Sequence, residues 1–112
     1  MGPYNQAVSI GNLIFTAGQI PLDRQGRMVA GAIKEQTEQV MQNLAAVLAE
    51  GGSSLERVVK ATVFLKDLND FAGMNEVFGQ YFKNETAPAR TTIQVARIPK
   101  DSLVEIEVVA YI

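Results

Sequence analysis

The amino-acid sequence predicts an α+β fold in which two helices cover one face of a mixed β-sheet. Two segments have the 3.6-residue periodicity of amphipathic helices, and five shorter runs have the alternation or the β-branched content of strands. Their order along the chain is strand, strand, helix, strand, helix, strand, strand (ββαβαββ). Two amphipathic helices can cover only one face of one sheet, so the sequence predicts a two-layer sandwich with one sheet face left uncovered.

The chain begins with a predicted β-hairpin. The β-prone runs Ala7–Ile10 and Leu13–Ala17 flank a Gly-Asn pair, which is a two-residue turn signal. Gly18 follows the second run, where a glycine either ends a strand or lets the backbone approach a ligand closely. Residues 22–32 are predicted to form a polar connection that turns at Asp23-Arg24-Gln25-Gly26.

Two helices and one strand form the predicted middle of the chain. The first helix covers Ile33 to Glu50, the strand Val58 to Lys66, and the second helix Phe71 to Phe82, after a cap at Asp67-Leu68-Asn69-Asp70. The apolar stripe of the first helix and the inward face of the second are expected to build the core. These residues are Ile33, Val40, Met41, Leu44, Val47 and Leu48, and then Phe71, Met74, Val77, Phe78 and Tyr81.

The last quarter of the chain, Pro88 to Tyr111, is predicted to form a second hairpin with a polar turn at residues 99–102. Alternation assigns Thr91, Ile93 and Val95 of the first strand to one face and Arg90, Thr92 and Gln94 to the other. In the second strand, alternation assigns the aliphatic side chains to the core and the two glutamates to the opposite face. The uncovered sheet face is therefore expected to carry Arg90, Thr92, Gln94, Glu105, Glu107, Leu103, Val109, Phe64 and Tyr111, whereas Val104, Ile106, Val108 and Ala110 enter the core.

Composition limits the possible chemistry. The 112 residues are expected to form a single domain, 1–112, with a net charge of −2, no Cys and no His. No basic patch favours nucleic acid and no stretch approaches a membrane span, so we expect neither a nucleic-acid partner nor a membrane. The commonest zinc ligands are absent, and we expect no metal and no cofactor. Without a signal peptide, a cytoplasmic protein is expected. The chain opens abruptly at Met1-Gly2-Pro3-Tyr4, which suggests that a natural N-terminal segment is missing.

Several motifs, in order along nearly the whole chain, resemble the reactive intermediate deaminase family (Rid, or YjgF-type, enamine/imine deaminases). The resemblance is strong because the motifs are long and correctly ordered. They are Gly2-Pro3-Tyr4-Asn5-Gln6-Ala7, Ala17-Gly18-Gln19-Ile20-Pro21, Asn43-Leu44-Ala45-Ala46-Val47-Leu48, Val59-Lys60-Ala61-Thr62-Val63-Phe64-Leu65, Pro88-Ala89-Arg90, Val95-Ala96-Arg97-Ile98-Pro99-Lys100-Asp101 and Val104-Glu105-Ile106-Glu107.

The resemblance implies a chorismate-mutase-like α+β fold and a homotrimer whose sheets face inward. It implies ligand sites in the clefts between subunits. The activity it implies is that of a 2-iminobutanoate/2-iminopropanoate deaminase, a hydrolase that acts on C–N bonds. Such an enzyme converts 2-imino acids, or enamines such as 2-aminoacrylate and 2-aminocrotonate, to 2-oxo acids and ammonia, and so limits metabolite damage.

The resemblance also implies roles for individual residues. Arg90 would bind the substrate carboxylate, which suits a planar, bidentate cation. Glu105 would hold the attacking water and pass a proton to the leaving ammonia, and Tyr4 would orient the imine nitrogen or the water. Gly18 would bring a backbone group close to the ligand, and Thr92 its backbone amide. Such a site needs neither His nor Cys, because an imine carbon is already electrophilic.

Other residues are expected to have structural roles or depart from the family pattern. Glu107 is expected to be structural or to lie at a subunit interface, and Arg97 and Lys100 are expected to form ion pairs on the surface. Ala17, beside the substrate-binding Gly18, stands where many active members have Ser. Thr91-Thr92 replaces a common Ser-Cys or Ser-Thr pair, and Asn5 replaces a frequent Ser.

Two alternatives to the enzyme stay open. One is a non-catalytic binder of small 2-oxo or amino acids, which Ala17 favours because a hydroxyl near the ligand is lost. The other is a chaperone-like homotrimer that binds protein. A ribonuclease role has little physical support from the sequence, which has no His and no basic groove.

Overall fold

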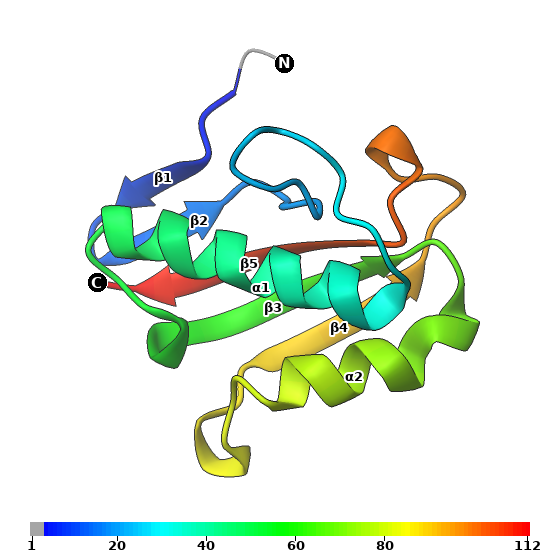
Figure 1. Ribbon diagram of the computed structural model, residues 1–112. Helices are drawn as coiled ribbons and strands as arrows, with labels where there is room; N and C mark the ends of the chain where they lie inside the picture. Colours follow the sequence, from blue (N-terminus) through cyan, green and yellow to red (C-terminus); the bar gives the residue numbers. More distant parts are fainter. Residues whose placement is uncertain (1–3) are drawn as a thin grey trace.

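The computed structural model describes residues 4–112 and confirms the predicted α+β fold (Figure 1). Gly2 and Pro3 of the N-terminal motif lie outside the described residues. Two helices lie on one face of a five-stranded sheet. The elements are β1 (Ala7–Ile10), β2 (Leu13–Thr16), α1 (Ile33–Glu50), β3 (Val58–Leu65), α2 (Phe71–Gly79), β4 (Ala89–Gln94) and β5 (Val104–Tyr111). Neither helix of residues 4–112 has the length and apolar content that crossing a bilayer requires.

The sheet has the strand order β1-β2-β5-β3-β4, so the predicted hairpin of the last two strands is wrong. β3 lies between them, parallel to β4 and antiparallel to β5. Parallel strands need a crossover connection, and α2 supplies the one that joins β3 to β4. The chain then passes the end of β3, where the Val95 amide donates to Leu65 and the Lys66 amide donates to Leu103. The turn at residues 99–102 therefore belongs to a crossing connection between two strands that do not pair.

The core lies between the sheet and the two helices. The predicted inward face of β5 is confirmed, because its four aliphatic side chains are almost fully buried. Most of the predicted stripe of α1 is buried against them. The main core residues are Ile14, Val40, Met41, Leu44, Leu48, Ala61, Val63, Leu65, Met74, Phe78, Val104, Ile106, Val108 and Ala110.

The helices depart from the predicted pattern at three points. Gln36, which is not part of the predicted apolar stripe, is buried, and its side-chain oxygen accepts a hydrogen bond from the Leu103 amide at 2.8 Å. α2 ends at Gly79, three residues before Phe82. Phe71, expected in the core, is 40% exposed at the beginning of α2. The Asp67 carboxylate accepts from the Asn69 amide and so caps the short 3-10 helix Leu68–Asp70 that leads into α2, whereas Asp70, at the N-cap of α2 itself, makes no side-chain capping bond.

A bulge in β3 reverses the predicted faces at its beginning. Val58 pairs with Ala110 and Lys60 with Val109, so Val59 is the extra residue between them. Val58 is therefore buried (4% exposed), whereas Val59, which regular alternation with Ala61 and Val63 would place on the core face, is 46% exposed. A simple alternation of side chains cannot anticipate a bulge, because the pattern of β-branched residues continues through it.

The faces of β4 are the opposite of those predicted. Its register places Arg90 beside Ala61 and Thr92 beside Val63, and these β3 residues face the helices. Arg90 and Thr92 are accordingly half-buried on the helix side, whereas Ile93 is 42% exposed on the uncovered side. The prediction assumed that the apolar side chains of β4 face the helices. It failed because the uncovered face is itself rich in apolar groups.

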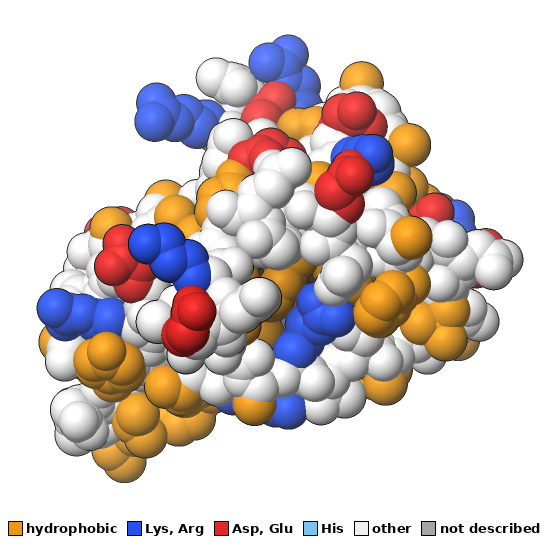
Figure 2. Space-filling model, turned by 90° about the horizontal axis from the view of Figure 1, so that it is seen from below, with side chains coloured by type: hydrophobic (Ala, Val, Ile, Leu, Met, Phe, Trp, Pro, Cys, Tyr) orange, Lys and Arg blue, Asp and Glu red, His pale blue; other side chains and the backbone are white. Residues whose placement is uncertain are grey.

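The uncovered sheet face is only partly polar. It carries Glu105, Glu107, Val109 and Phe64, as predicted, whereas Leu103 packs against the core. Figure 2 views the molecule from the edge made by β4 and α2, and apolar side chains gather at one corner of this view. The large apolar residues exposed on the uncovered face are Val8, Ile10, Phe15, Ile93 and Tyr111.

The bulge in β3 makes adjacent valines respond differently to the same substitution. Val58→Thr buries a hydroxyl among aliphatic groups and is expected to lower the free energy of unfolding by about 1–3 kcal/mol. Val59→Thr, the matched control, is expected to stay within about 0.5 kcal/mol of the wild type. Urea denaturation of both variants measures the difference, and equal losses would show that the bulge is absent.

Candidate functional site

A cavity of about 490 Å³ brings together three of the predicted site residues, Tyr4, Gly18 and Glu105. It lies between the N-terminal segment, the connection that follows β2, and the beginning of β5. Ala17, Arg90 and Thr92, the other predicted site residues, are not among the residues of 4–112 that line it. The lining residues are Tyr4, Gln6, Gly18, Gln19, Ile20, Leu22, Asp23, Arg24, Gly26, Asn43, Pro99, Lys100 and Glu105.

Gly18 is the point at which the backbone approaches the Glu105 carboxyl. Two backbone hydrogen bonds between Gln19 and Ile106, of 2.8 and 3.2 Å, hold this segment against β5. A Cβ atom at Gly18 would lie only 2.8 Å from the carboxyl carbon of Glu105. The present position of the carboxyl group thus depends on glycine here, since any larger residue would displace it.

Glu105 is half-buried, and its environment disfavours the ionised form. Burial raises the pKa of the Glu105 carboxyl above its ordinary value, and the neighbouring charge of Glu107 raises it further. Glu107 lies two residues along β5 on the same face and is exposed. A carboxyl group with a raised pKa exchanges protons more readily near neutral pH than an ordinary glutamate does, which suits general acid–base chemistry.

The N-terminal segment that carries Tyr4 is tied to the cavity through Gln6. The Gln19 side-chain amide donates to Gln6 Oε1 at 2.8 Å, and the Ala17 amide donates to the Gln6 carbonyl at 2.8 Å. Gln19 is 9% exposed, so it forms part of the floor. Tyr4 is 55% exposed, which leaves its hydroxyl free to meet a ligand.

Arg90 lies outside this cavity, beneath α2. Its guanidinium carbon is 4.8 Å from the ring centroid of Phe78 and 5.4 Å from that of Phe71, which are cation–π distances. Burial lowers the pKa of Arg90 from its ordinary value, and the cation makes no ion pair within residues 4–112. A half-buried arginine without an acidic neighbour is able to take an anionic group of a ligand.

The structure thus separates the predicted site into two halves. Glu105, Gly18 and Tyr4 meet at one cavity, and Glu105 pairs with Phe64 on the uncovered face. Arg90 and Thr92 lie on the helix side of an edge strand. One chain alone does not bring Arg90 together with Glu105.

Sequence reasoning missed the residues that surround Arg90. Phe71 and Phe78, assigned to the core, also form the aromatic support of the guanidinium group. Helical spacing places the exposed Asn75 on the same side of α2 as these two rings. In the sequence, Phe71, Asn75 and Phe78 follow the i, i+4, i+7 spacing of one helix face. This spacing indicates a site around Arg90 only once β4 is known to face α2.

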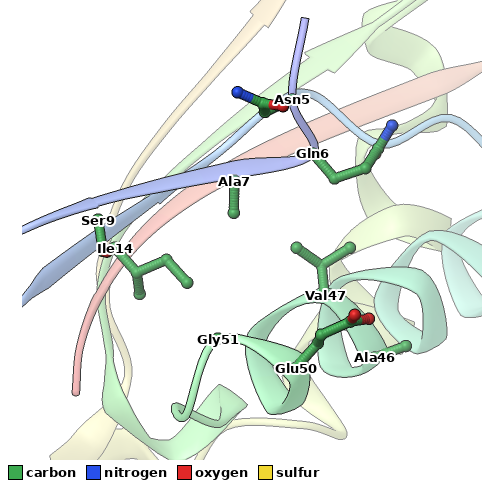
Figure 3. Close-up of a pocket in the computed structure, with 9 residues that line it drawn as sticks. All are labelled: Asn5, Gln6, Ala7, Ser9, Ile14, Ala46, Val47, Glu50 and Gly51. Atoms are coloured by element: carbon green, nitrogen blue, oxygen red, sulfur yellow. The ribbon is translucent and has the colours of Figure 1, made fainter.

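A second cavity, of about 440 Å³, holds none of the predicted catalytic or substrate-binding residues. It lies between β1 and the C-terminal half of α1, and Figure 3 shows Ala7 and Ile14 on the strand side facing Val47 of α1. Within residues 4–112 there is also no cluster of three or more His, Cys, Asp or Glu side chains that could hold a metal ion.

Comparison with known proteins identifies the family. The family described as Endoribonuclease L-PSP matches residues 1–112. A RutC family protein of Pyrococcus abyssi is 57% identical over 112 residues, which are 99% of this chain and 87% of the relative. The 2-iminobutanoate/2-iminopropanoate deaminase of Salmonella typhimurium is 43% identical over 112 residues, 98% of this chain and 88% of the relative.

A solved structure agrees with the sequence matches. The crystal structure of E. coli TdcF with bound serine has a TM-score of 0.92 and 42% sequence identity, and the alignment covers 100% of this chain and 90% of that one. The predicted resemblance is confirmed, and the chain belongs to the reactive intermediate deaminase (Rid, YjgF-type) family.

The contact between Gly18 and Glu105 predicts the effect of one added methyl group. Gly18→Ala is expected to push the Glu105 carboxyl into solvent, because its flexible side chain yields more easily than the backbone. The pKa of Glu105 should then fall toward its ordinary value, which an NMR titration of its side-chain carboxyl carbon measures. Gly79→Ala, where an added Cβ meets no atom within 4 Å, is the control and should leave that pKa unchanged. An unchanged pKa in Gly18→Ala would contradict this geometry.

Proposed function

We propose that this protein is a 2-iminobutanoate/2-iminopropanoate deaminase, which hydrolyses 2-imino acids and their enamine tautomers to 2-oxo acids and ammonia. The observation that carries the proposal is the half-buried Glu105 carboxyl, held against the Gly18 backbone at the wall of a cavity. The name of the Salmonella relative supports the reaction class. The serine bound in the TdcF structure supports a small amino-acid-like ligand.

The proposed active site is completed by a second copy of the chain in a homotrimer. Arg90 of one subunit would enter the cavity that holds Glu105, Gly18 and Tyr4 of its neighbour. The separation of these residues on opposite sides of the sheet supports an arrangement of this kind. The exposed apolar side chains of the uncovered face support it as well, since such patches are typical of contacts between subunits.

Arg90 has the properties that binding of the substrate carboxylate requires. A guanidinium group can donate two parallel hydrogen bonds to a carboxylate, and no acidic residue of 4–112 pairs with this one. Phe71 and Phe78 restrict the plane of the guanidinium, so less freedom is lost when the ligand binds. Thr92, on the same side of β4, would add its backbone amide, and Ala17 would line the site beside Gly18.

The reaction starts from the protonated imine and then needs three proton transfers. Ionised Glu105 accepts a proton from water as the water oxygen bonds to the imine carbon and the C=N electron pair moves to nitrogen, which gives a neutral carbinolamine. Protonated Glu105 returns that proton to nitrogen, and the C–N bond breaks as the hydroxyl oxygen forms the C=O bond of the 2-oxo acid. Ionised Glu105 then accepts the hydroxyl proton, which leaves with ammonia as ammonium. Tyr4 would orient the water or the nitrogen. The raised pKa of Glu105 suits its role as an acid as well as a base, because burial and the charge of Glu107 make its protonated form easier to reach than that of an ordinary glutamate.

A non-catalytic binder of 2-oxo or amino acids is the second candidate. Ala17 favours it, because this position contributes only its backbone amide to Gln6 and has no hydroxyl to offer a ligand. Binding of 2-oxobutanoate without turnover of the imine would support this candidate. A chaperone-like homotrimer would instead bind no carboxylate in the cavity.

A coupled assay tests the proposed reaction. A dehydratase generates 2-aminocrotonate from threonine at a pH where spontaneous hydrolysis is slow, and release of 2-oxobutanoate is followed. The protein is expected to accelerate release, whereas Arg90→Gln and Glu105→Gln should each lower kcat/KM by about 100-fold or more. Because the family description names an endoribonuclease, the same preparation is assayed with RNA. RNA cleavage without imine turnover would overturn the proposal.

Mixing these two inactive variants tests whether the site spans two subunits. After unfolding and refolding together, Arg90→Gln and Glu105→Gln chains should recover about a quarter of the wild-type activity, because that share of the sites joins an intact Arg90 to an intact Glu105. The variants refolded separately are the control. No recovery in co-assembled oligomers would place both residues of each site on one chain.

The role of Glu105 as a base predicts a direction of pH dependence. Activity should fall as the pH drops through the pKa of Glu105, because only the ionised carboxylate accepts a proton. Glu107→Gln removes the negative charge that helps to raise this pKa, so the acidic limb of the kcat/KM profile should shift to lower pH. Glu85→Gln, an exposed carboxylate in another turn, is the control. An acidic limb that stays in place in Glu107→Gln would argue that another group controls it.

A further inference from the structure

Two cations, Arg24 and Lys100, line the cavity that holds Glu105. Both are exposed, and within residues 4–112 neither forms an ion pair. The other acidic residue in the lining, Asp23, is already engaged. Its carboxylate accepts hydrogen bonds from the Gln25 and Arg27 amides at 2.9 Å and lies 3.6 Å from the Arg27 guanidinium. Arg24 and Lys100, which we call the rim cations, therefore form no ion pair with an acidic residue of the cavity within residues 4–112.

Lys100 stands on a backbone that is held in an unfavourable conformation. Lys100 and Asp101 have φ angles of +57° and +54°, which residues other than glycine seldom adopt. The turn is held by Arg97, whose guanidinium donates to the two Asp101 carboxylate oxygens at 3.0 and 3.3 Å, and by the buried Ser102. Arg97 thus forms the predicted surface ion pair, but Lys100, expected to form one as well, does not. Lys100 is left on the wall of the cavity.

Arg24 is held on the other side of the cavity by a tight turn. The Gly26 amide donates to the Asp23 carbonyl at 2.9 Å, and Gly26 has a φ of +78° that closes the turn. Arg24 is one of the two central residues of this turn. Both rim cations therefore stand on constrained turns that lie far apart in the sequence and meet at one cavity.

We propose that the rim cations select 2-imino acids whose side chain carries a second carboxylate, that is, dicarboxylic imino acids. The inference rests on the proposed function. If Arg90 of a neighbouring subunit binds the α-carboxylate and Glu105 faces the imine carbon, Arg24 and Lys100 are the charges left in the cavity for the rest of the substrate. An anionic side chain would satisfy them, whereas the ethyl group of 2-iminobutanoate would not.

Relative turnover of two imines tests this specificity. An amino-acid oxidase generates 2-iminoglutarate from glutamate and 2-iminobutanoate from 2-aminobutanoate. Semicarbazide is added to trap the imine in competition with its hydrolysis by the protein. The specificity ratio is kcat/KM for the first imine divided by kcat/KM for the second. It should exceed one in the wild type, and Arg24→Gln and Lys100→Gln should each lower it by about fivefold, the upper range for one exposed charge pair. Added salt should lower the wild-type ratio as well.

Lys83→Gln is the matched control, because it removes one positive charge at a cavity formed by other residues and should leave the ratio unchanged. A wild-type ratio below one, or a ratio that Arg24→Gln and Lys100→Gln do not change, would overturn the proposal. So would an equal fall in the Lys83→Gln control, since this would indicate an effect of net charge alone.

Calorimetric titration with the product-like 2-oxo acids separates failure of this inference from failure of the proposed function. If neither imine is turned over, the deaminase proposal fails, yet 2-oxoglutarate should still bind more tightly than 2-oxobutanoate. Lys100→Gln should then remove about fivefold of that preference. Equal affinity of the wild type for the two 2-oxo acids would overturn the role of the rim cations.

Discussion

The pairing of β5 with β2 on one side and β3 on the other positions both the core and the candidate site. A strand paired on both sides has its backbone groups satisfied, so its side chains are free to alternate between two environments. On one side Val104, Ile106 and Val108 enter the core, and on the other Glu105 and Glu107 face away from the helices. The same hydrogen bonds that build the core therefore also hold the candidate acid–base residue.

Edge strand β4 has a different role because only one of its sides is paired, with β3. Its helix-side residues lie beneath α2 without being fully enclosed. This position lets Arg90 be half-buried against Phe71 and Phe78 while its guanidinium stays accessible to a ligand or to another chain. A guanidinium deep in the core would need an acidic partner, and a fully exposed one would bind a carboxylate weakly.

The connections contribute as much to the cavity as the strands do. The segment after β2 is held to β5 through the paired backbones of Gln19 and Ile106, which brings Gly18 against Glu105. The Gln6–Gln19 hydrogen bond brings in the N-terminal segment, and the constrained turn at Lys100 closes the other side. The cavity is thus assembled from segments that no short sequence window contains.

From the sequence alone we could predict the order of the elements, the bounds of α1, the inward face of β5 and the family, because these depend on local periodicity and on contiguous motifs. Tertiary contacts were needed to show that β3 separates β4 from β5, that the bulge buries Val58 instead of Val59, and that Arg90 faces α2. Alternation defines two faces of a strand but not which face the helices cover. That choice is made by register, and register depends on hydrogen bonds between segments far apart in the chain.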